Sequence, residues 1–290
     1  MEQNARYDAI VIGAGQGGGP LATALAGAGW KTALIEQEHV GGTCVNEGCT
    51  PTKTMVASAR VAYLARRAAD YGVRTGPISV DMTVVRKRKR DIVESFRSGS
   101  EQSIKAAQGL DFLMGQARFS DPKQLDVILN SGGTRQIHAE KIFINTGERP
   151  TQPSLNGVEQ VPVLNSTSIM ELDTVPEHLL IVGGGYVGLE FGQMFRRFGS
   201  QVTIIQRGAH LLTREDEDVA DAVAKLLRED GIEVLLQATP LQVTKQANEQ
   251  LQLRVQTTDG ERTLVGSHLL MAAGRTPNTN MLNATATGIV

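Results

Sequence analysis

The sequence predicts an α/β protein built from two Rossmann-like units. Residues 7–12 (YDAIVI) form a short apolar run typical of a buried strand, and they lead directly into the glycine-rich turn 13–18 (GAGQGG) and a helical stretch. The same order recurs at 179–182 (LLIV) and 183–188 (GGGYVG), again followed by a helical stretch. Two such strand–turn–helix segments indicate two related domains more strongly than one glycine motif would.

The first glycine turn has the features of a dinucleotide-binding fingerprint. Gly13 allows the tight turn, Gly15 lets a pyrophosphate approach the backbone, and Gly18 lets the helix pack on the strand. The amides and the dipole at the start of the helix then favour a diphosphate. The next strand, 32–35, ends in Glu36, whose carboxylate can accept hydrogen bonds from both hydroxyls of an adenosine ribose.

The second fingerprint differs at the position that contacts the ribose. Gly183, Gly185 and Gly188 repeat the glycine pattern, but Gln206 stands where the first copy has its acid, and Arg207 follows it. An amide does not repel a 2'-phosphate, and a neighbouring guanidinium can bind one. We therefore expect NADPH, with NADH as the alternative if Arg207 is a solvated turn residue.

The chain has only two cysteines, Cys44 and Cys49, both within residues 41–53 (GGTCVNEGCTPTK). Two thiols beside a bound flavin can pass two electrons from the ring to an external disulfide. An incidental pair of buried thiols is the alternative. A metal site would require more soft ligands, and only His39 is close in sequence, so we expect no resident metal.

The order of these motifs, followed by residues 273–279 (AGRTPNT), resembles the class I pyridine nucleotide-disulfide oxidoreductases. That family includes dihydrolipoamide dehydrogenase, glutathione reductase and mercuric reductase. The resemblance implies two three-layer ββα dinucleotide-binding domains, the second inserted into the first. We expect an FAD-binding domain at 1–150, an NAD(P)-binding domain at 151–273, and the start of the return to the FAD domain at 274–290.

The resemblance also implies roles in electron transfer. Cys49 would form the charge-transfer contact with the flavin, and Cys44 would be the interchange thiol that faces substrate. Lys53 would lie beside flavin N5 as a buried ammonium paired with Glu190, unless the two are separate surface charges. Tyr186 matches the tyrosine that covers the flavin until nicotinamide displaces it.

Further contacts with the two cofactors follow from the same resemblance. Ala117 corresponds to a backbone contact with adenine, and Thr146 and Gly147 match a strand end near FAD, where Asn145 replaces the usual alanine. The expected FAD residues are Gly13, Gly15, Gly18, Glu36, Thr43, Lys53, Ala117, Thr146 and Gly147. The expected NAD(P) residues are Gly183, Gly185, Tyr186, Gly188, Gln206, Arg207 and Gly274.

Composition limits the other classes of function. With 41% hydrophobic residues, 290 residues can bury two cores. A net charge of −2 gives no general attraction to nucleic acid or to an anionic membrane, and the basic residues 86–90 are expected on the solvated face of a helix over 82–107. No apolar run of about twenty residues and no signal-like start are present, so we expect a cytoplasmic protein.

Between the fingerprints and after them, the sequence predicts the remaining elements. A thiol-bearing helix is expected at 50–71, directly after Cys49, and a β-rich insert spans 110–140. Strands at 201–205 and 232–236 and a hairpin-like region at 241–270 are expected to complete the sheet of the second domain.

The expected activity is an FAD-dependent, NAD(P)H-linked oxidoreductase that passes electrons through flavin to the Cys44–Cys49 disulfide. Its substrate would be a small-molecule disulfide, a dihydrolipoyl group or Hg(II). A diaphorase or transhydrogenase is an alternative, although it has no need of a second thiol.

Members of the resembled family continue well beyond the position of Val290, into a dimerisation domain with a catalytic His–Glu pair. We therefore expect a homodimer for a complete member and not for this chain, and a nucleotide-binding fragment without turnover is the second hypothesis. None of the histidines matches the catalytic context, and each is expected in a loop or at the surface: His39, His138, His178, His210 and His268.

Overall fold

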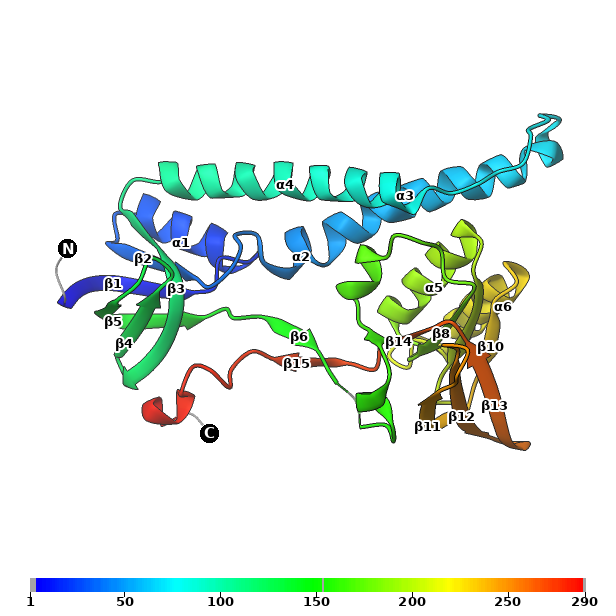
Figure 1. Ribbon diagram of the computed structural model, residues 1–290. Helices are drawn as coiled ribbons and strands as arrows, with labels where there is room; N and C mark the ends of the chain where they lie inside the picture. Colours follow the sequence, from blue (N-terminus) through cyan, green and yellow to red (C-terminus); the bar gives the residue numbers. More distant parts are fainter. Residues whose placement is uncertain (1–3, 153, 289–290) are drawn as a thin grey trace. The chain divides into compact units, whose positions relative to one another are not determined.

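The computed structural model describes residues 4–152 and 154–288, which form two compact units (Figure 1). Unit 1 consists of the chain up to Pro51, Arg90–Arg149 and the chain from Thr276, and unit 2 consists of Thr52–Lys89 and Pro150–Arg275. Both units combine helices with mainly parallel strands, so the predicted α/β class is confirmed. The domain boundaries drawn from the sequence stay predictions.

Unit 1 is built on five strands: β1 (Asn4–Ile12), β2 (Thr32–Glu36), β3 (Leu110–Asp121), β4 (Gln124–Leu129) and β5 (Thr134–Ile144). The pairs β1–β2, β2–β3 and β1–β5 are parallel, whereas β3–β4 and β4–β5 are antiparallel, so that the five pairings close on themselves. The β-rich insert predicted at 110–140 is thus confirmed as β3, β4 and most of β5.

Alternation along the strands of unit 1 divides its core in two. Val11 and Leu34 pack with Ala22 of helix α1 (Gly18–Gly27) and Ile104 of helix α4 (Met82–Ala106). Neighbours of opposite orientation, such as Ile10, face the cluster formed with β3–β5. The strand ends that carry the first fingerprint are therefore fixed by packing on both faces.

Unit 2 contains a five-stranded parallel sheet in the order β10-β9-β8-β14-β7. Its strands are β7 (Val163–Leu164), β8 (His178–Val182), β9 (Gln201–Ile205), β10 (Glu233–Leu235) and β14 (His268–Met271). The strands predicted from 201–205 and 232–236 are present as β9 and β10.

The hairpin-like region does not join this sheet as a whole, and that expectation is wrong. Strands β11 (Thr239–Lys245), β12 (Leu251–Thr257) and β13 (Gly260–Gly266) form a separate antiparallel sheet, and only β14 enters the parallel one. The reason is burial: alternate apolar residues of β12, such as Leu253, cluster with Leu180 and Leu269 of the parallel sheet. The three strands cover a face of the sheet rather than extend its edge.

Helices cover the opposite face of the parallel sheet. Leu179 and Ile181 of β8 cluster with residues of α5 (Tyr186–Phe198) and α6 (Glu217–Glu229), whereas Leu180 and Val182 belong to the cluster with β11–β13. Unit 2 therefore has three layers, ββα, as Figure 1 also shows.

The remaining elements are short, apart from α3 (Cys49–Arg66). The predicted thiol helix ends five residues early, and a separate 3₁₀ turn, η1 (Ala68–Tyr71), follows and is closed by Gly72 at φ 77°. The others are α2 (Gly42–Asn46), β6 (Glu148–Pro150), β15 (Arg275–Pro277), which pairs with β6, and the 3₁₀ helices η2 (Val158–Gln160), η3 (Ser168–Glu171) and η4 (Ala284–Thr287).

The basic run on α4 is only partly a solvated face. The helix itself ends one residue before the predicted limit, but Lys89 is buried and forms an ion pair with Glu171, whose backbone oxygen also accepts a hydrogen bond from Arg86. The expectation of a wholly solvated cluster is therefore wrong, because unit 2 uses these side chains to anchor η3.

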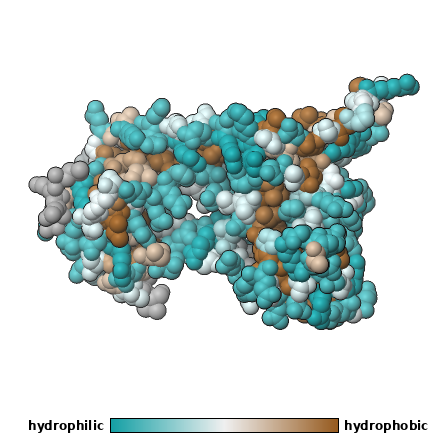
Figure 2. Space-filling view, in the orientation of Figure 1, coloured by the Kyte–Doolittle hydropathy of each residue, from teal (hydrophilic) through white to brown (hydrophobic). Residues whose placement is uncertain are grey.

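Apolar side chains are exposed along the second half of α3, where Val61 and Leu64 are 67% and 45% accessible (Figure 2). Within the described residues, the helices are all too short or too polar to cross a membrane.

Candidate functional site

Two glycines of the first fingerprint are required by the protein's own backbone. Gly13 has φ +104°, and a Cβ built there would lie 2.3 Å from the backbone oxygen of Asn145. A Cβ on Gly18 would lie 1.9 Å from the backbone oxygen of Gly13. These distances leave no room for a methyl group, so helix α1 can start against β1 only with glycine at both positions.

Glu36 lies at the end of β2, directly beside this turn. Its Oε2 accepts a hydrogen bond from the backbone N–H of Ala14 (2.8 Å) and its Oε1 accepts one from Glu38 (2.9 Å). Each carboxylate oxygen has a further lone pair, so the group can still accept from a ribose hydroxyl. The turn therefore fixes the Glu36 carboxylate and leaves acceptor capacity on both of its oxygens.

The segment that carries the thiols is built directly on the first fingerprint. The N–H of Gly41 donates to the oxygen of Ala14 (2.8 Å), and Gln16 Nε2 donates to the oxygen of Gly41 (3.3 Å). Gly42, at φ +59°, approaches so closely that its Cβ would lie 2.7 Å from the Cα of Gly15. The glycines of the turn and of the thiol segment thus fit against each other.

Cys44 and Cys49 lie in two successive helices, Cys44 in the middle of α2 and Cys49 at the first position of α3. Both thiols are free, Cys44 half-buried and Cys49 exposed. A hydrogen bond from the Cys44 thiol to Cys49, together with burial, raises the pKa of Cys44 above its ordinary value. The two sulfurs are therefore close enough to exchange a proton, as a pair that opens and closes as a disulfide must be.

Lys53 and Glu190 form an ion pair within unit 2, between α3 and α5. The alternative of two separate surface charges is therefore wrong. The Lys53 side chain is 65% exposed, and a buried ammonium beside a bound flavin stays a prediction. The pairing depends on α3 and α5 sharing one core, in which Met55 packs with Phe191 and Met194.

The second fingerprint repeats the backbone contacts of the first. Gly183 has φ +121° and its Cβ would lie 2.4 Å from the oxygen of Ala272, while a Cβ on Gly188 would lie 2.1 Å from the oxygen of Gly183. Gly185 precedes α5, and no described atom lies within 4 Å of its Cβ position. That open side of Gly185 fits the approach of a pyrophosphate.

Gln206 is held by two hydrogen bonds that fix its amide. Its Oε1 accepts from the N–H of Gly184 (3.1 Å), and its Nε2 donates to the backbone oxygen of His210 (3.2 Å). Arg207 is exposed beside it. A glutamate at position 206 could not donate to His210, so the loop after β9 selects an amide there.

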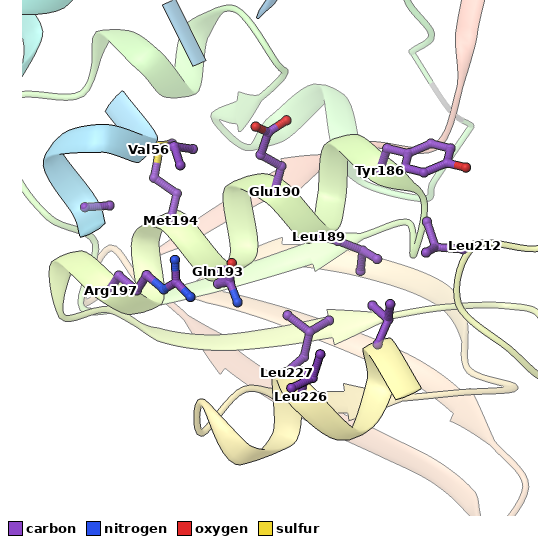
Figure 3. A pocket seen from close by; sticks show the side chains of 12 residues that line it. Val56, Tyr186, Leu189, Glu190, Gln193, Met194, Arg197, Leu212, Leu226 and Leu227 are labelled. Atoms are coloured by element: carbon purple, nitrogen blue, oxygen red, sulfur yellow. The ribbon is translucent and has the colours of Figure 1, made fainter. Parts of the chain in front are cut away.

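Tyr186 is the first residue of α5 and is 62% exposed. Its hydroxyl donates to Glu215, and this hydrogen bond raises the pKa of the phenol. Tyr186 and Glu190 also line a cavity of about 340 Å³ between α3, α5 and α6, whose other walls are largely apolar (Figure 3). The cavity does not mark the pyrophosphate position, because the fingerprint glycines are not among the described residues that line it.

The other expected FAD residues are on strands and loops of unit 1. Ala117 is buried in β3, and Thr43 is exposed in α2. The backbone oxygens of Thr146 and Gly147 accept hydrogen bonds from the side chain and backbone of Asn278 (3.1 and 3.0 Å). Gly274 is exposed, in unit 2, at φ +130°.

Sequence reasoning noted Asn145 only as a departure from alanine. In the structure its Nδ2 donates to the oxygen of Gly13 (3.3 Å), and a Cβ on Gly17 would lie 2.9 Å from its Oδ1. Asn145 thus braces the fingerprint turn from the end of β5. The signal in the sequence was the asparagine at a motif position where the resembled family has alanine.

The expectation of a loop or surface position is wrong for three histidines. His138 lies within β5 and is half-buried. His178 and His268 begin β8 and β14, and both are half-buried, which lowers the pKa of each. His210 is in a loop as expected, with Nε2 and Nδ1 each 3.4 Å from carboxylates of Glu217 and Asp221. The strand positions were missed because a sheet can accept a polar residue at a strand start or at a half-buried position within a strand.

Comparison with known proteins defines the class. Residues 7–289 match the family model described as pyridine nucleotide-disulphide oxidoreductase, and the chain belongs to that family. The family resemblance inferred from the motifs is thereby confirmed.

Two curated relatives illustrate the range of the family. The chain is 36% identical over 290 residues to a mercuric reductase of Streptomyces lividans, and 33% identical over 282 residues to a dihydrolipoyl dehydrogenase of Mycoplasma pneumoniae. These matches cover 100% and 96% of this chain but 61% and 59% of the relatives. The chain therefore spans about three fifths of their length.

Solved structures agree with the fold. A Cu(II) complex of the HOCl-induced flavoprotein disulfide reductase RclA from Escherichia coli matches with a TM-score of 0.84 at 37% identity. A second structure, of the HOCl-induced flavoprotein disulfide reductase RclA from the same organism, matches with a TM-score of 0.83 at the same identity. Each match covers 98% of this chain and 60% of the other. The Rossmann-like architecture is thereby confirmed, and the chain is a member of an oxidoreductase family that includes flavoproteins.

Proposed function

We propose that the chain forms the nucleotide-binding and dithiol part of an FAD-dependent, NAD(P)H-linked reductase. Its Cys44–Cys49 pair would deliver electrons to a disulfide or to a thiophilic metal ion. The observation that carries this proposal is the attachment of the thiol segment to the first fingerprint, through Gly41 and Ala14 and through the contact of Gly42 with Gly15.

The first fingerprint fits FAD. Glu36 can accept from the ribose, the start of α1 offers backbone N–H groups to a diphosphate, and Gly15 keeps the backbone open at the turn. We also assign Thr43, Ala117, Thr146, Gly147 and Lys53 to this cofactor from the family pattern. Bound FAD would supply an acceptor for hydride from NAD(P)H and a donor of two electrons.

The cysteines would complete the transfer. The Cys44–Cys49 disulfide would take up two electrons and two protons and become a dithiol. One thiolate then attacks a substrate disulfide, which breaks the substrate S–S bond, and the second closes the protein disulfide again and releases two substrate thiols. For a divalent mercury substrate, the same two electrons would yield the metal.

Lys53 and Glu190 would act together near the thiol pair. Lys53 follows Cys49 by one turn of α3, and Glu190 holds its ammonium in place. A fixed positive charge there stabilises negative charge on a reduced ring.

The substrate class follows from chemistry shared by the relatives. Mercuric reductases are named for Hg(II), one RclA structure holds Cu(II), and the dihydrolipoyl enzyme is named for a dithiol. All of these substrates are thiophilic or sulfur-containing. We propose the same class here: a small-molecule disulfide, a dihydrolipoyl group or Hg(II), with Cu(II) added by the RclA comparison.

The thiol pair can be tested with the purified protein and four acceptors: a small disulfide, lipoamide, Hg(II) and Cu(II). Cys44→Ser and Cys49→Ser should each lower NADPH-dependent reduction of the true acceptor by at least about 10², while FAD stays bound. A general reduction of dyes that survives both substitutions would contradict the dithiol route. Bound FAD and coenzyme without reduction of any acceptor would favour a nucleotide-binding fragment.

For the coenzyme we propose a preference for NADPH, supported by the amide of Gln206 and the exposed guanidinium of Arg207. Arg207→Ala should weaken NADPH binding about tenfold or more, as expected for a lost hydrogen bond to a charged group, and should leave NADH almost unchanged. Arg60→Ala, at an exposed arginine of α3, is the matched control. Equal loss for both coenzymes, measured by calorimetry, would contradict the assignment.

A further inference from the structure

Asn46 lies between the two cysteines in sequence, and every polar atom of its side chain is engaged. Its Nδ2 donates to the backbone oxygens of Val40 (3.0 Å) and Gly42 (2.9 Å), and its Oδ1 accepts from Nε of Arg97 (2.7 Å). Both amide donors and the amide acceptor therefore have partners within unit 1. This fixes the orientation of the amide, because a flipped group would bring oxygen against oxygen.

Two of the three hydrogen bonds close the segment that contains Cys44. The acceptors Val40 and Gly42 precede the cysteine and the donor Asn46 follows it. Residues 40–46 therefore form a closed loop that consists of the turn at Gly41 and the short helix α2. Gly41 and Gly42 have φ +93° and +59°, which gives the backbone the turn that the closure requires. Without the side chain of Asn46, the backbone oxygen of Val40 would lose the hydrogen bond that Nδ2 of Asn46 donates to it.

Arg97 connects the loop to a long helix. It lies on α4, its side chain is only 25% exposed, and its Nη1 is 3.4 Å from Glu94 one turn earlier. The same helix is anchored in the core of unit 1 by Ile104, which packs with Val11 of β1. A planar guanidinium on a packed helix is a rigid donor, so the position of Asn46 is set by the fold and not only by its own loop.

We propose that Asn46 and Arg97 are positioning residues that hold Cys44 in place for closure onto Cys49. The proposal rests on the redox role proposed above and concerns neither cofactor. Asn46 acts on the backbone that carries Cys44, and Arg97 acts through Asn46.

The physical consequence concerns the equilibrium between dithiol and disulfide. In the reaction, the protein dithiol and oxidised glutathione give the protein disulfide and two molecules of reduced glutathione, so two electrons and two protons pass to glutathione. When the loop is already ordered in the dithiol, closing the bond orders little more of the chain. When the loop is loose, closure must also order the backbone, which costs conformational entropy and disfavours the disulfide.

The experiment measures this equilibrium constant in glutathione buffers of known ratio, with acid quenching, alkylation and mass spectrometry. Asn46→Asp removes both amide donors at nearly constant shape and should lower the constant at least tenfold, which corresponds to about 30 mV. Arg97→Gln should lower it less, and Arg97→Lys, which retains a cationic donor, should restore most of the native value.

The double variant separates positioning from a general loss of structure. If Arg97 acts through Asn46, Arg97→Gln should add nothing further to Asn46→Asp. Additive effects would overturn the coupling, and an unchanged constant in both single variants would overturn the proposal. Should Asn46→Asp fail to fold, Arg97→Gln and its lysine rescue decide the question alone.

Asn248→Asp is the matched control for the added charge, because Asn248 lies in the turn between β11 and β12 of unit 2. Its equilibrium constant should equal that of the native protein. The measurement uses neither NAD(P)H nor flavin turnover, so its outcome is independent of the proposed enzyme activity. A native protein that reduces no acceptor would refute the proposed function while the glutathione result still decided the role of Asn46.

Discussion

The two fingerprints share one backbone solution and differ in one side chain. In both, the first glycine fits against a backbone oxygen at the end of a neighbouring strand, with Cβ positions 2.3 and 2.4 Å from Asn145 and Ala272. In both, the last glycine fits against the oxygen of the first, with Cβ positions 1.9 and 2.1 Å away. The turn is thus specified by contacts within the protein, independently of any ligand.

The side chain at the end of the second strand differs. Glu36 accepts from two backbone N–H groups, whereas Gln206 accepts from one and donates to the oxygen of His210. Each side chain accepts a hydrogen bond from the residue that follows the first glycine of its own fingerprint, Glu36 from Ala14 and Gln206 from Gly184. The comparison teaches that the glycines secure the backbone of each turn, and that the two turns differ in the charge of the side chain held beside them.

The largest effect should come from adding a methyl group to the last glycine of each fingerprint, where that glycine contacts the backbone oxygen of the first glycine. Gly18→Ala and Gly188→Ala each place a methyl group on a carbonyl oxygen, and each should lower the free energy of unfolding by about 3 kcal/mol or more. Urea unfolding with probes for each unit should show the loss in the unit that carries the change. Gly27→Ala and Gly185→Ala are controls, since no described atom lies within 4 Å of either Cβ position. Mild effects of Gly18→Ala would show that the turn relaxes.

Exchanging glutamate and glutamine at positions 36 and 206 should alter nucleotide binding and leave the fold intact. Glu36→Gln leaves one acceptor oxygen for two backbone donors, and FAD affinity should fall about tenfold or more. Gln206→Glu loses the bond to His210 and adds negative charge, so NADPH affinity should fall about tenfold or more, with a smaller change for NADH. Calorimetric titration of each nucleotide tests both. Unchanged affinities would show that neither position faces a ribose.

Of the two fingerprints, the first is the one that the thiol segment contacts among the described residues, and the titration of the segment can be measured separately. Because the bond to Cys49 raises the pKa of Cys44, Cys49→Ala should shift the pH profile of Cys44 alkylation toward lower pH. Iodoacetamide rates between about pH 7 and 10, followed by mass spectrometry, provide the measurement. Cys49→Ser keeps a hydroxyl acceptor and should shift the profile less. A shift toward higher pH would contradict the hydrogen bond.

The smallest effect should be a difference in pH dependence between the units. Burial lowers the pKa of His178 at the start of β8, so its unfolded form binds the proton more readily, and stability is lost as pH falls below about 6.5. Burial and Asp111 raise the pKa of Tyr7 in β1, so stability there is present below about pH 10 and is lost as pH rises further. Urea unfolding midpoints are measured as a function of pH. His178→Gln should reduce the loss of stability at low pH, and Tyr7→Phe should reduce the loss at high pH. Parallel pH curves for both units would contradict these assignments.

Local patterns in the sequence were sufficient for the parts of the site that follow one another along the chain. The two glycine turns, the strand ends at Glu36 and Gln206 and the paired cysteines are motifs of fixed spacing, and the chain geometry of a strand, a turn and a helix dictates their positions. The same patterns predicted helix α4 to within one residue of its end.

Only the tertiary structure decided which distant residues meet. The sheet β11–β13 covers a face instead of extending an edge, Lys89 is buried against Glu171, and Asn145 braces a turn more than a hundred residues away. Arg97 reaches Asn46 for the same reason, because α4 returns across the sheet of unit 1. Periodicity and spacing encode the conformation of neighbouring residues, whereas these contacts depend on which surfaces can be buried together, and a single sequence does not state that choice.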